Sequence, residues 1–227
     1  KLAGVAKEIE AGLDGFLYRI MKQVCVKSHD KRQDGGHTKL NFIDSVARRY
    51  MNNGIKKFLG MDKVQLCFTG AAPPNIGVVK YFAGLGIDIV GAYGMSELSG
   101  SQCFSKPHMF IDGFSGLPVP GTEVKVDELT GELCFRGRQV MLGYHGETTP
   151  CVDEDNWFHS GDTGEIHKNG YIKINGRVDD TIITSYGKNI MPTVIESYLC
   201  ERCEDVENAI VVGNNMKYLG LLVTLKP

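Results

Sequence analysis

The chain has 227 residues, of which 42% are apolar, and its 27 acidic and 25 basic residues leave a net charge of −2. That balance gives no electrostatic basis for binding nucleic acid. No run of about 18 apolar residues occurs, so no membrane-spanning helix is predicted. Seven irregularly spaced cysteines are typical of reduced thiols, which predicts a cytoplasmic protein rather than a disulfide-stabilised secreted one.

The first quarter of the chain is predicted to be helical. Apolar residues at helical spacing predict one helix over residues 1–28 and a second over 42–58 that ends at Gly60, with a polar loop at 29–39 between them. The first helix is expected to pack on a core. The alternative is a helix lying on a membrane surface, which would attach the protein peripherally to a membrane.

Two short apolar strands follow, at residues 64–70 and 86–92. Between them, Pro73 or Pro74 would start a helix that runs to Phe82. The order strand, helix, strand predicts a parallel pair. The loops TGAAPP and YGMSE would then follow two strands at the same edge of a sheet, where such sheets bind ligands.

The sequence pattern changes between residues 114 and 175, where short apolar runs that predict strands alternate with glycine and proline turns. The Asn-Gly pairs at 169–170 and 175–176 are turn signals, and together these features predict an antiparallel or barrel-like subdomain. The polar segment 176–180 marks a boundary. Beyond it we expect a short strand and loop over 180–187, a helix that begins at proline over 192–201, and two further strands over 207–213 and 219–225.

Five stretches in this order resemble the AMP-forming acyl-CoA synthetases of the adenylate-forming enzyme superfamily. They are TGAAPP (69–74), YGMSE (93–97), GELCFRG with MLGYHG (131–137 and 141–146), WFHSGD (157–162) and NGYIKINGRVDDTIITSYGKNIMPTVIE (169–196). GAAPP, YGMSE-x-SG and GKNIMP-x-x-IE look most like the long-chain and bubblegum-type fatty acyl-CoA synthetases.

The resemblance implies an α/β fold. Residues 1–113 would be the later α/β part of a large AMP-binding domain with a parallel sheet, and residues 114–178 its β-barrel-like subdomain. Residues 179–227 would begin a small α+β C-terminal domain. Such enzymes join a carboxylate to the α-phosphate of ATP, release pyrophosphate, and then transfer the acyl group to coenzyme A. Bringing two anions together requires charge neutralisation and positioning. The implied cofactors and partners are therefore ATP or AMP, Mg²⁺, a long-chain fatty acid and coenzyme A.

The motif YGMSE would bind the nucleotide. By resemblance, Tyr93 lays its ring on adenine, Gly94 lets the backbone approach the nucleotide, and Met95 lies beside them. Ser96 stands where the family commonly has threonine, and its hydroxyl would donate to the α-phosphate. Glu97 would hold Mg²⁺. These two residues are the candidate catalytic ones; read without the other motifs, the stretch is a turn at a strand end.

Two later motifs would bind the nucleoside. Asp162 would accept the ribose hydroxyls, and Arg177, 15 residues later as in the family, would also reach the ribose. Ile174 falls where the family has an apolar residue against adenine. Taken alone, Asp162 is a turn aspartate and Ile174 a barrel-strand residue.

The remaining predicted site residues follow from the same resemblance. Gly91 would leave room for the acyl chain, and Asp179 matches the hinge about which the small domain turns. Lys188 would approach the nucleotide or coenzyme A, or would be an ordinary solvated lysine. The loop that lines the adenine and acyl pockets would comprise Gly70, Ala71, Ala72 and Pro73.

Some residues with reactive side chains are not expected to have a catalytic or metal-binding role. Cys200 and Cys203 have no second pair of ligands nearby, so no metal or redox role is predicted, and His159 is expected to be structural. The family's phosphate loop is not found before Tyr93, nor its C-terminal catalytic lysine before Pro227. We therefore expect an internal fragment that is inactive alone. The alternatives are an adenylation enzyme that loads a carrier protein and a non-catalytic, truncated nucleotide-binding paralogue.

Overall fold

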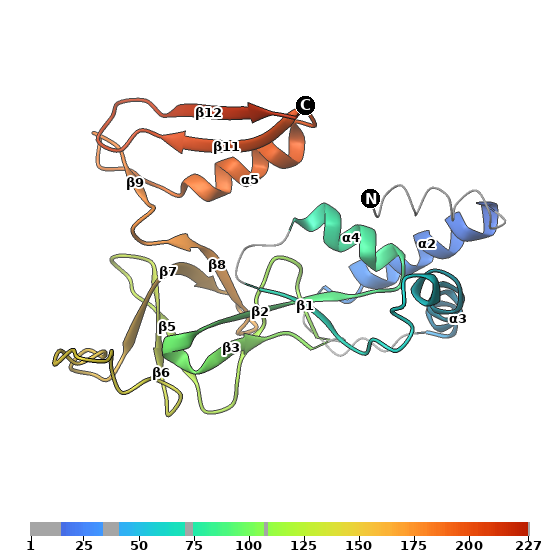
Figure 1. The fold of residues 1–227 in the computed structure, drawn as a ribbon, viewed down its shortest axis with the longest axis horizontal. Helices are drawn as coiled ribbons and strands as arrows, with labels where there is room; N and C mark the ends of the chain where they lie inside the picture. The colour runs from blue at the N-terminus through green and yellow to red at the C-terminus, as the bar shows by residue number, and fades with distance from the viewer. Residues whose placement is uncertain (1–14, 34–40, 71–74, 107–108, 227) are drawn as a thin grey trace. The chain divides into compact units, whose positions relative to one another are not determined.

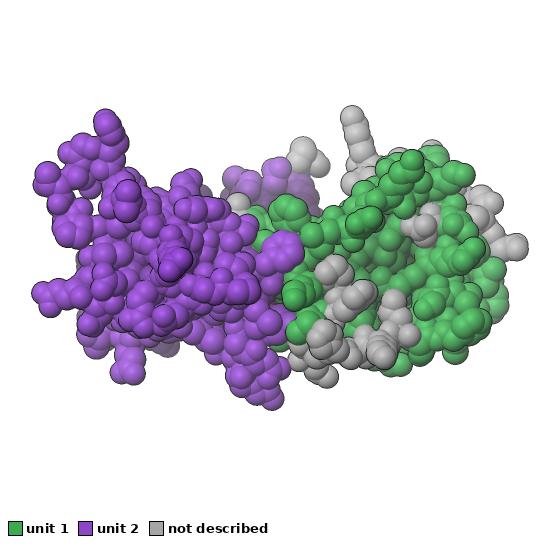
Figure 2. Space-filling view, turned by 90° about the horizontal axis from the view of Figure 1, so that it is seen from below, with its two compact units in different colours: residues 1–92, 105–113 green, residues 93–104, 114–227 purple. Residues whose placement is uncertain are grey.

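The computed structural model describes residues 15–33, 41–70, 75–106 and 109–226 (Figure 1). The chain forms two compact units, shown in two colours in Figure 2. Unit 1 comprises residues 1–92 and 105–113, and unit 2 comprises residues 93–104 and 114–227. These units do not test the predicted divisions after residues 113 and 178, which stay predictions.

Helices dominate unit 1. They are α2 (Gly15–Asp30), α3 (Phe42–Met51) with a π-helical continuation (Asn52–Lys56), and α4 (Ile76–Gly84). On α2, Tyr18 and Cys25 are buried in a core that also contains Met51 of α3. Core packing is thus confirmed for the described part of the first predicted helix, whereas residues 1–14 lie outside the description. Among the described residues, none of the helices is both long enough and apolar enough to cross a membrane.

Two helix boundaries differ from the prediction. Helix α2 continues to Asp30 instead of ending at residue 28, so the predicted loop begins later. Helix α4 begins at Ile76, and the prediction that Pro73 or Pro74 starts it was wrong. Asn75 caps this helix, because its side-chain oxygen accepts a hydrogen bond from the backbone N–H of Val78 at 3.0 Å.

The two strands predicted to be parallel are so. In β1 (Cys67–Thr69) and β2 (Ile89–Met95), Cys67 lies opposite Ile89 and Thr69 opposite Gly91. Strand β2 has the predicted length of seven residues but begins and ends three residues later, so it includes Tyr93, Gly94 and Met95. The backbone of β3 (Gly100–Phe104) approaches this end of β2 closely, and a Cβ at Gly94 would overlap the carbonyl oxygen of Gly100.

A buried ionic cluster in unit 1 is centred on Asp88, the residue immediately before β2. Asp88 accepts hydrogen bonds from Arg32 at 2.7 and 2.8 Å and from Arg48 at 2.9 and 3.1 Å. The fully buried His29 ring lies between Asp88, 3.0 Å from Nδ1, and Asp112, 3.0 Å from Nε2. Burial works to lower the pKa of His29, but the hydrogen bonds to Asp112 and Asp88 outweigh it and raise the pKa from 6.5 to about 9.

Unit 2 contains an antiparallel sheet that curls into a half-barrel (Figure 1). Its strands, in spatial order, are β5 (Glu123–Val126), β6 (Glu132–Arg136), β7 (Phe158–Ile166) and β8 (Ile172–Arg177). Side chains alternate along β6: Leu133 and Phe135 are buried in the core of the unit, and Glu132 and Cys134 point to the opposite face. The barrel-like character is as predicted, and β3 pairs with the short β4 (Leu117–Pro118).

The C-terminal part of unit 2 contains a helix and two antiparallel strand pairs. Strand β9 (Ile182–Ile183) pairs with β10 (Asn189–Ile190), and β11 (Val206–Val212) pairs with β12 (Gly220–Leu225). Helix α5 (Pro192–Arg202) begins with proline, whose missing N–H costs nothing in the first turn. These elements agree with the sequence pattern to within one or two residues, except that the segment 180–187 forms only a two-residue strand.

Candidate nucleotide site

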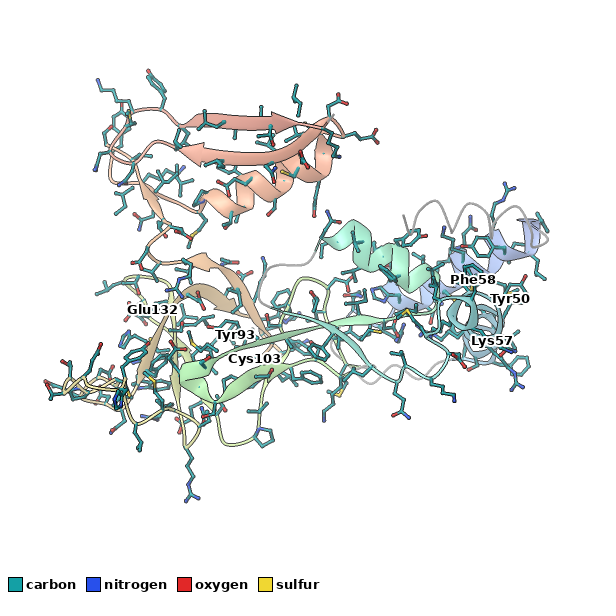
Figure 3. The ribbon with its side chains drawn as sticks, viewed as in Figure 1. Tyr50, Lys57, Phe58, Tyr93, Cys103 and Glu132 are labelled. Atoms are coloured by element: carbon teal, nitrogen blue, oxygen red, sulfur yellow. The ribbon has the colours of Figure 1, made fainter. Side chains whose placement is uncertain are left out.

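Tyr93 connects two of the predicted motifs. Its hydroxyl donates to Oδ2 of Asp162 at 2.6 Å, which joins YGMSE to WFHSGD within unit 2. Its ring, labelled in Figure 3, lies in unit 2. The ring stacks on Phe135 with centroids 5.7 Å apart and an interplanar angle of 25°. Burial and then the Asp162 carboxylate raise the pKa of Tyr93 well above its usual value, so the phenol stays protonated. Core packing and a charged acceptor therefore fix this residue at both ends.

Arg177 holds the other oxygen of Asp162. The two residues are directly opposite in the register of β7 and β8, and Nη1 donates to Oδ1 at 3.0 Å. The same Nη1 also donates to the carbonyl of Ser160 at 3.3 Å. Gly161 makes room for the guanidinium: its φ is +71°, and a Cβ there would lie 2.8 Å from Nη2. A side chain at residue 161 would therefore displace Arg177.

The Asp162 carboxylate keeps capacity for a ligand. Each of its oxygens accepts one bond from the protein, and a carboxylate oxygen can accept a second. Its side chain is 13% exposed, whereas that of Arg177 is 49% exposed. The hydrogen bond to the Asp162 carboxylate raises the pKa of Arg177 above its ordinary value, so the guanidinium stays charged. The arrangement is an oriented Asp162 carboxylate beside the half-exposed Arg177 guanidinium, which is also open to a ligand.

Glu97 lies on the short 3₁₀ helix (Ser96–Leu98) that follows β2. Its carboxylate accepts a hydrogen bond from the hydroxyl of Tyr144 at 2.9 Å, and its backbone carbonyl accepts one from the N–H of Met141 at 2.8 Å. The motif MLGYHG thus packs against the end of YGMSE, and the Glu97 bond raises the pKa of Tyr144. Ser96, at the start of this helix, is exposed.

The surroundings of Glu97 fit a magnesium ligand. The side chain is half-buried, one oxygen is held by Tyr144, and no lysine or arginine among the described residues forms an ion pair with it. Mg²⁺ is usually bound through one or two carboxylates, with waters and substrate phosphates completing its coordination. A single oriented carboxylate free of a competing cation suits that role.

Other predicted residues of unit 2 lie in less constrained positions. Ile174 is partly buried on β8 and packs against the core, and Met95 receives a long contact from the Tyr93 hydroxyl to its sulfur. Asp179 is exposed and close enough to Arg177 to contribute to its raised pKa. Lys188 is exposed in a turn, where its backbone N–H donates to Thr184 at 3.1 Å.

The predicted residues of unit 1 are only partly described. Gly70 follows β1, and a Cβ on it would lie 3.0 Å from the carbonyl oxygen of Ala92. The carbonyl of Gly91 accepts a hydrogen bond from the N–H of Ser105 at 3.0 Å. Ala71, Ala72 and Pro73 lie outside the described residues, so the expected pocket-lining loop stays a prediction.

Several contacts were absent from the sequence analysis. The bond between Tyr93 and Asp162 spans 69 positions, and no local pattern signals it. Phe135 could have been assigned to the core from strand alternation, and Tyr144 belongs to a motif already singled out. The structure gives a reason for glycine at position 94 that we did not predict, because a side chain there would overlap the backbone of β3. The predicted approach of Gly94 to the nucleotide stays a prediction.

Two models of known enzyme families match this sequence. The model of the AMP-binding enzyme family matches residues 18–145, which include the YGMSE motif, and that of the AMP-binding enzyme C-terminal domain matches residues 179–227. The chain belongs to the AMP-binding enzyme family. The resemblance deduced from the motifs is thereby confirmed.

Two relatives whose names specify an enzyme activity match most of this chain. Long-chain-fatty-acid–CoA ligase ACSBG2 of Gallus gallus is 36% identical over 198 residues, which cover 84% of this chain and 26% of the relative. Long-chain-fatty-acid–CoA ligase ACSBG1 of Homo sapiens is 36% identical over 179 residues, covering 76% and 25%. The chain therefore spans about a quarter of the length of these AMP-binding enzymes.

Solved structures support the fold. The ATP-bound RpMatB-BxBclM chimera B3 superposes with a TM-score of 0.64 at 25% identity, over 80% of this chain and 40% of the other. The O-succinylbenzoate coenzyme A synthetase of Bacillus subtilis, in complex with ATP and magnesium ion, superposes with a TM-score of 0.62 at 21% identity, covering 80% and 41%. The mixed α/β fold with its half-barrel sheet thus corresponds to part of an adenylate-forming enzyme.

Proposed function

We propose that this chain carries the nucleoside-binding and magnesium-binding residues of an ATP-dependent long-chain fatty acid–CoA ligase. The enzyme would convert a fatty acid to acyl-AMP and then to acyl-CoA. The observation that carries the proposal is the oriented Asp162 carboxylate, held by Tyr93 at 2.6 Å and by Arg177 at 3.0 Å. Its substrate class is taken from the relatives, whose names specify long-chain fatty acids and coenzyme A.

The nucleoside half of the site would work by orientation. Asp162 would accept the two ribose hydroxyls with its remaining lone pairs, while Arg177 supplies a donor at the same place. Tyr93, pinned by Phe135 and Asp162, would offer its free ring face to adenine, with Ile174 adding apolar contact. Fixing the nucleoside of ATP in one pose would lower the entropy cost of the attack of the fatty-acid carboxylate on the α-phosphate, which releases pyrophosphate.

The phosphate half would work by charge. Bound Mg²⁺ supplies positive charge that offsets the approach of a carboxylate to the triphosphate. Glu97 would hold it through the oxygen that Tyr144 leaves free, and the Ser96 hydroxyl would donate to the α-phosphate. Gly91 and the loop Gly70–Pro73 would line the acyl pocket, Asp179 would act as hinge, and Lys188 would approach nucleotide or coenzyme A. These last roles rest on the family motifs alone.

The test is fatty-acid-dependent exchange between ATP and pyrophosphate by the whole protein that contains this chain, measured with acids from short to very long. Exchange with long acids, followed by thioester when coenzyme A is added, is the expected result. Exchange without thioester would support a carrier-protein acceptor instead. No exchange with any acid would overturn the proposal and favour a protein that binds nucleotide without catalysis.

A substitution at Glu97 tests the magnesium role. In the same whole protein, Glu97→Gln keeps the shape but removes the charge, so we expect adenylation to slow by roughly 10²–10³-fold, as when other charge-stabilising groups are removed. Transfer from pre-formed acyl-AMP to coenzyme A should slow far less. Glu165→Gln, which removes an exposed carboxylate paired with Lys173, is the matched control. Equal loss in both half-reactions would count against the assignment.

A further inference from the structure

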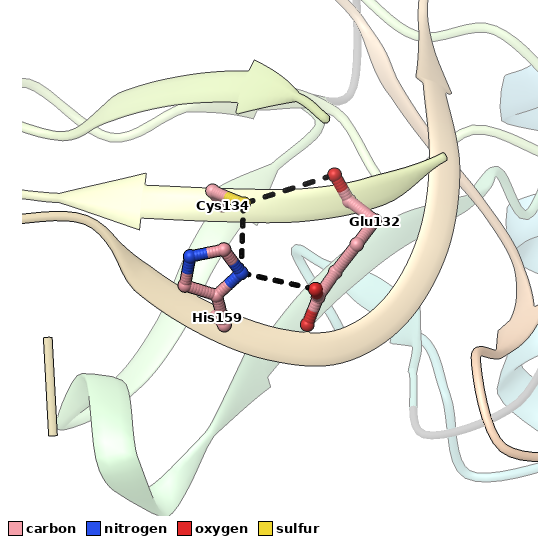
Figure 4. A group of neighbouring side chains, drawn as sticks. All are labelled: Glu132, Cys134 and His159. Atoms are coloured by element: carbon pink, nitrogen blue, oxygen red, sulfur yellow. Dashed lines mark hydrogen bonds and ion pairs between the residues drawn. The ribbon is translucent and has the colours of Figure 1, made fainter. Parts of the chain in front are cut away.

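Three potential metal ligands meet on the face of the half-barrel sheet opposite its core. Glu132 and Cys134 are two residues apart on β6, so they share one face, and His159 is the direct partner of Cys134 on β7 (Figure 4). One ligand atom of each lies within 4.8 Å of the other two. The residues that alternate with them, such as Leu133 and Phe158, are in the core. Neighbouring strands therefore present sulfur, nitrogen and oxygen at one point.

The separations suit a tetrahedral cation. Sγ of Cys134 is 3.6 Å from Nδ1 of His159, and that nitrogen is 3.0 Å from Oε2 of Glu132. Ordinary zinc bond lengths, about 2.3 Å to sulfur and about 2.1 Å to nitrogen and oxygen, give about 3.6 Å and about 3.4 Å for these pairs in a tetrahedron. The sulfur–nitrogen separation thus matches a tetrahedral site, the nitrogen–oxygen separation is a few tenths of an ångström short of one, and the sulfur–oxygen separation lies within 4.8 Å.

Outer contacts already orient two of the three groups. Nε2 of His159 lies 3.2 Å from a carboxylate oxygen of Asp153, the arrangement that commonly orients a metal-bound imidazole. Asp153 is itself fixed, because its other oxygen accepts bonds from the backbone N–H groups of Asp155 at 3.0 Å and Trp157 at 2.8 Å. The second oxygen of Glu132 accepts a bond from the N–H of Gly161 at 2.6 Å.

The charge around the cluster favours a cation. Glu132 and Asp153 flank the imidazole on both sides, while Cys134 is buried and His159 is 45% exposed. Lys125 lies opposite Cys134 on β5, but its ammonium sits over the Trp157 ring, 4.5 Å from the centroid. The partly exposed imidazole gives a cation access to the cluster from solvent.

We propose that Glu132, Cys134 and His159 form a site for a zinc-type divalent cation. The cation would bind the sulfur of Cys134, Nδ1 of His159 and a carboxylate oxygen of Glu132, and the thiol proton would pass to solvent. Sulfur and nitrogen ligands distinguish this site from the oxygen-only environment that Mg²⁺ prefers at Glu97. The inference does not depend on the proposed ligase function.

The test uses Co²⁺ as a spectroscopic probe of the purified 227-residue chain, followed by competition with Zn²⁺. We expect one Co²⁺ per chain with a thiolate-to-cobalt charge-transfer band, which Zn²⁺ removes. Cys134→Ser should abolish the band, and His159→Gln should weaken binding at least tenfold. Asp153→Asn keeps all three ligands and should weaken binding by about 10- to 100-fold.

The control is Cys203→Ser, which removes an exposed thiol of the CxxC sequence and leaves the cluster intact. It should bind Co²⁺ like the parent chain. Circular dichroism of each variant reports whether the fold survives; the exposed His159 gives a variant in which the core is unchanged. A band that persists in Cys134→Ser, a band lost in Cys203→Ser, or Co²⁺ binding without any thiolate band would overturn the proposal.

Discussion

Asp88 in unit 1 and Asp162 in unit 2 are carboxylates held by similar partners in different environments. Asp88 is held by two arginines and a histidine, and its side chain is 8% exposed, with Arg32 at 1%. Asp162 is held by one arginine and a tyrosine, and Arg177 is half exposed. The Asp88 carboxylate accepts five hydrogen bonds, and the Asp162 carboxylate accepts two.

The difference separates a stabilising cluster from the proposed binding site. A saturated carboxylate buried with its cations has no lone pair to offer, and removing it strands those cations in the interior. A carboxylate with free lone pairs can accept hydrogen bonds from ligand hydroxyls, and its ion pair with a half-exposed arginine adds little to stability. The two should therefore respond in opposite ways to substitution.

The largest expected effect is on stability at the buried cluster. Asp88→Asn leaves Arg32 and His29 without their shared counter-charge, so we expect the free energy of unfolding to fall by about 3–5 kcal/mol. Urea unfolding followed by circular dichroism measures it. Asp30→Asn, which breaks an exposed pair with Lys80, is the control and should cost less than about 1 kcal/mol. Similar losses in both variants would refute the distinction.

Raising the pH should weaken the same cluster. The folded pKa of His29 is about 9 and its ordinary value is 6.5, so its contribution is complete below pH 6.5 and is lost as pH rises toward 9. We expect more than about 2 kcal/mol of stability to disappear between pH 6 and pH 8.5. His145→Gln, which changes an exposed histidine outside the cluster, is the control and should keep this slope. His29→Gln should flatten it, and an unchanged slope in that variant would remove the explanation.

At Asp162 the effect should fall on binding. Asp162→Asn removes a charged acceptor, so AMP affinity should drop about 10- to 100-fold, measured by calorimetry on the whole protein. The free energy of unfolding should change by less than about 1 kcal/mol, because Arg177 is half solvated. Asp155→Asn, on an exposed turn of the same unit, is the control. A loss of stability as large as that of Asp88→Asn would show that the two carboxylates are equivalent.

The smallest effect is expected at Tyr144. Tyr144→Phe removes the hydrogen bond to Glu97 and should slow adenylation about 3- to 10-fold without altering the unfolding midpoint. Pyrophosphate exchange by the whole protein measures the rate. Tyr198→Phe changes a tyrosine of similar exposure elsewhere, 58% against 52%, and should leave the rate as it was. If both variants behave alike, Tyr144 does not position Glu97.

Much of the fold could be predicted from local signals. Apolar runs predicted strands that overlap β1 and β2, and Pro192 predicted the start of α5. Two of the boundaries that differ have a clear physical reason. The extension of β2 through Gly94 depends on the backbone of β3, which no propensity at glycine reports, and Asn75 rather than a proline caps α4.

The residues of the candidate site could be predicted from motifs, but the contacts between them could not. The spacing between Asp162 and Arg177 suggested a shared ligand, and the antiparallel register places them side by side. The Tyr93–Asp162 bond and the Cys134–His159 pair depend on how separate strands meet, over 69 and 25 positions. Such pairs follow from sheet register and lie beyond local sequence patterns.

Strand β2 also limits how this protein can be divided. Its first residues belong to unit 1 and Tyr93 to unit 2, and the chain passes between the units three times, after residues 92, 104 and 113. A gene segment that begins at residue 114 would encode the half-barrel without Tyr93 and Glu97. Neither unit could therefore be exchanged between related proteins as a single continuous cassette. Recombination that preserves the nucleotide site must carry residues 93–104 together with the half-barrel.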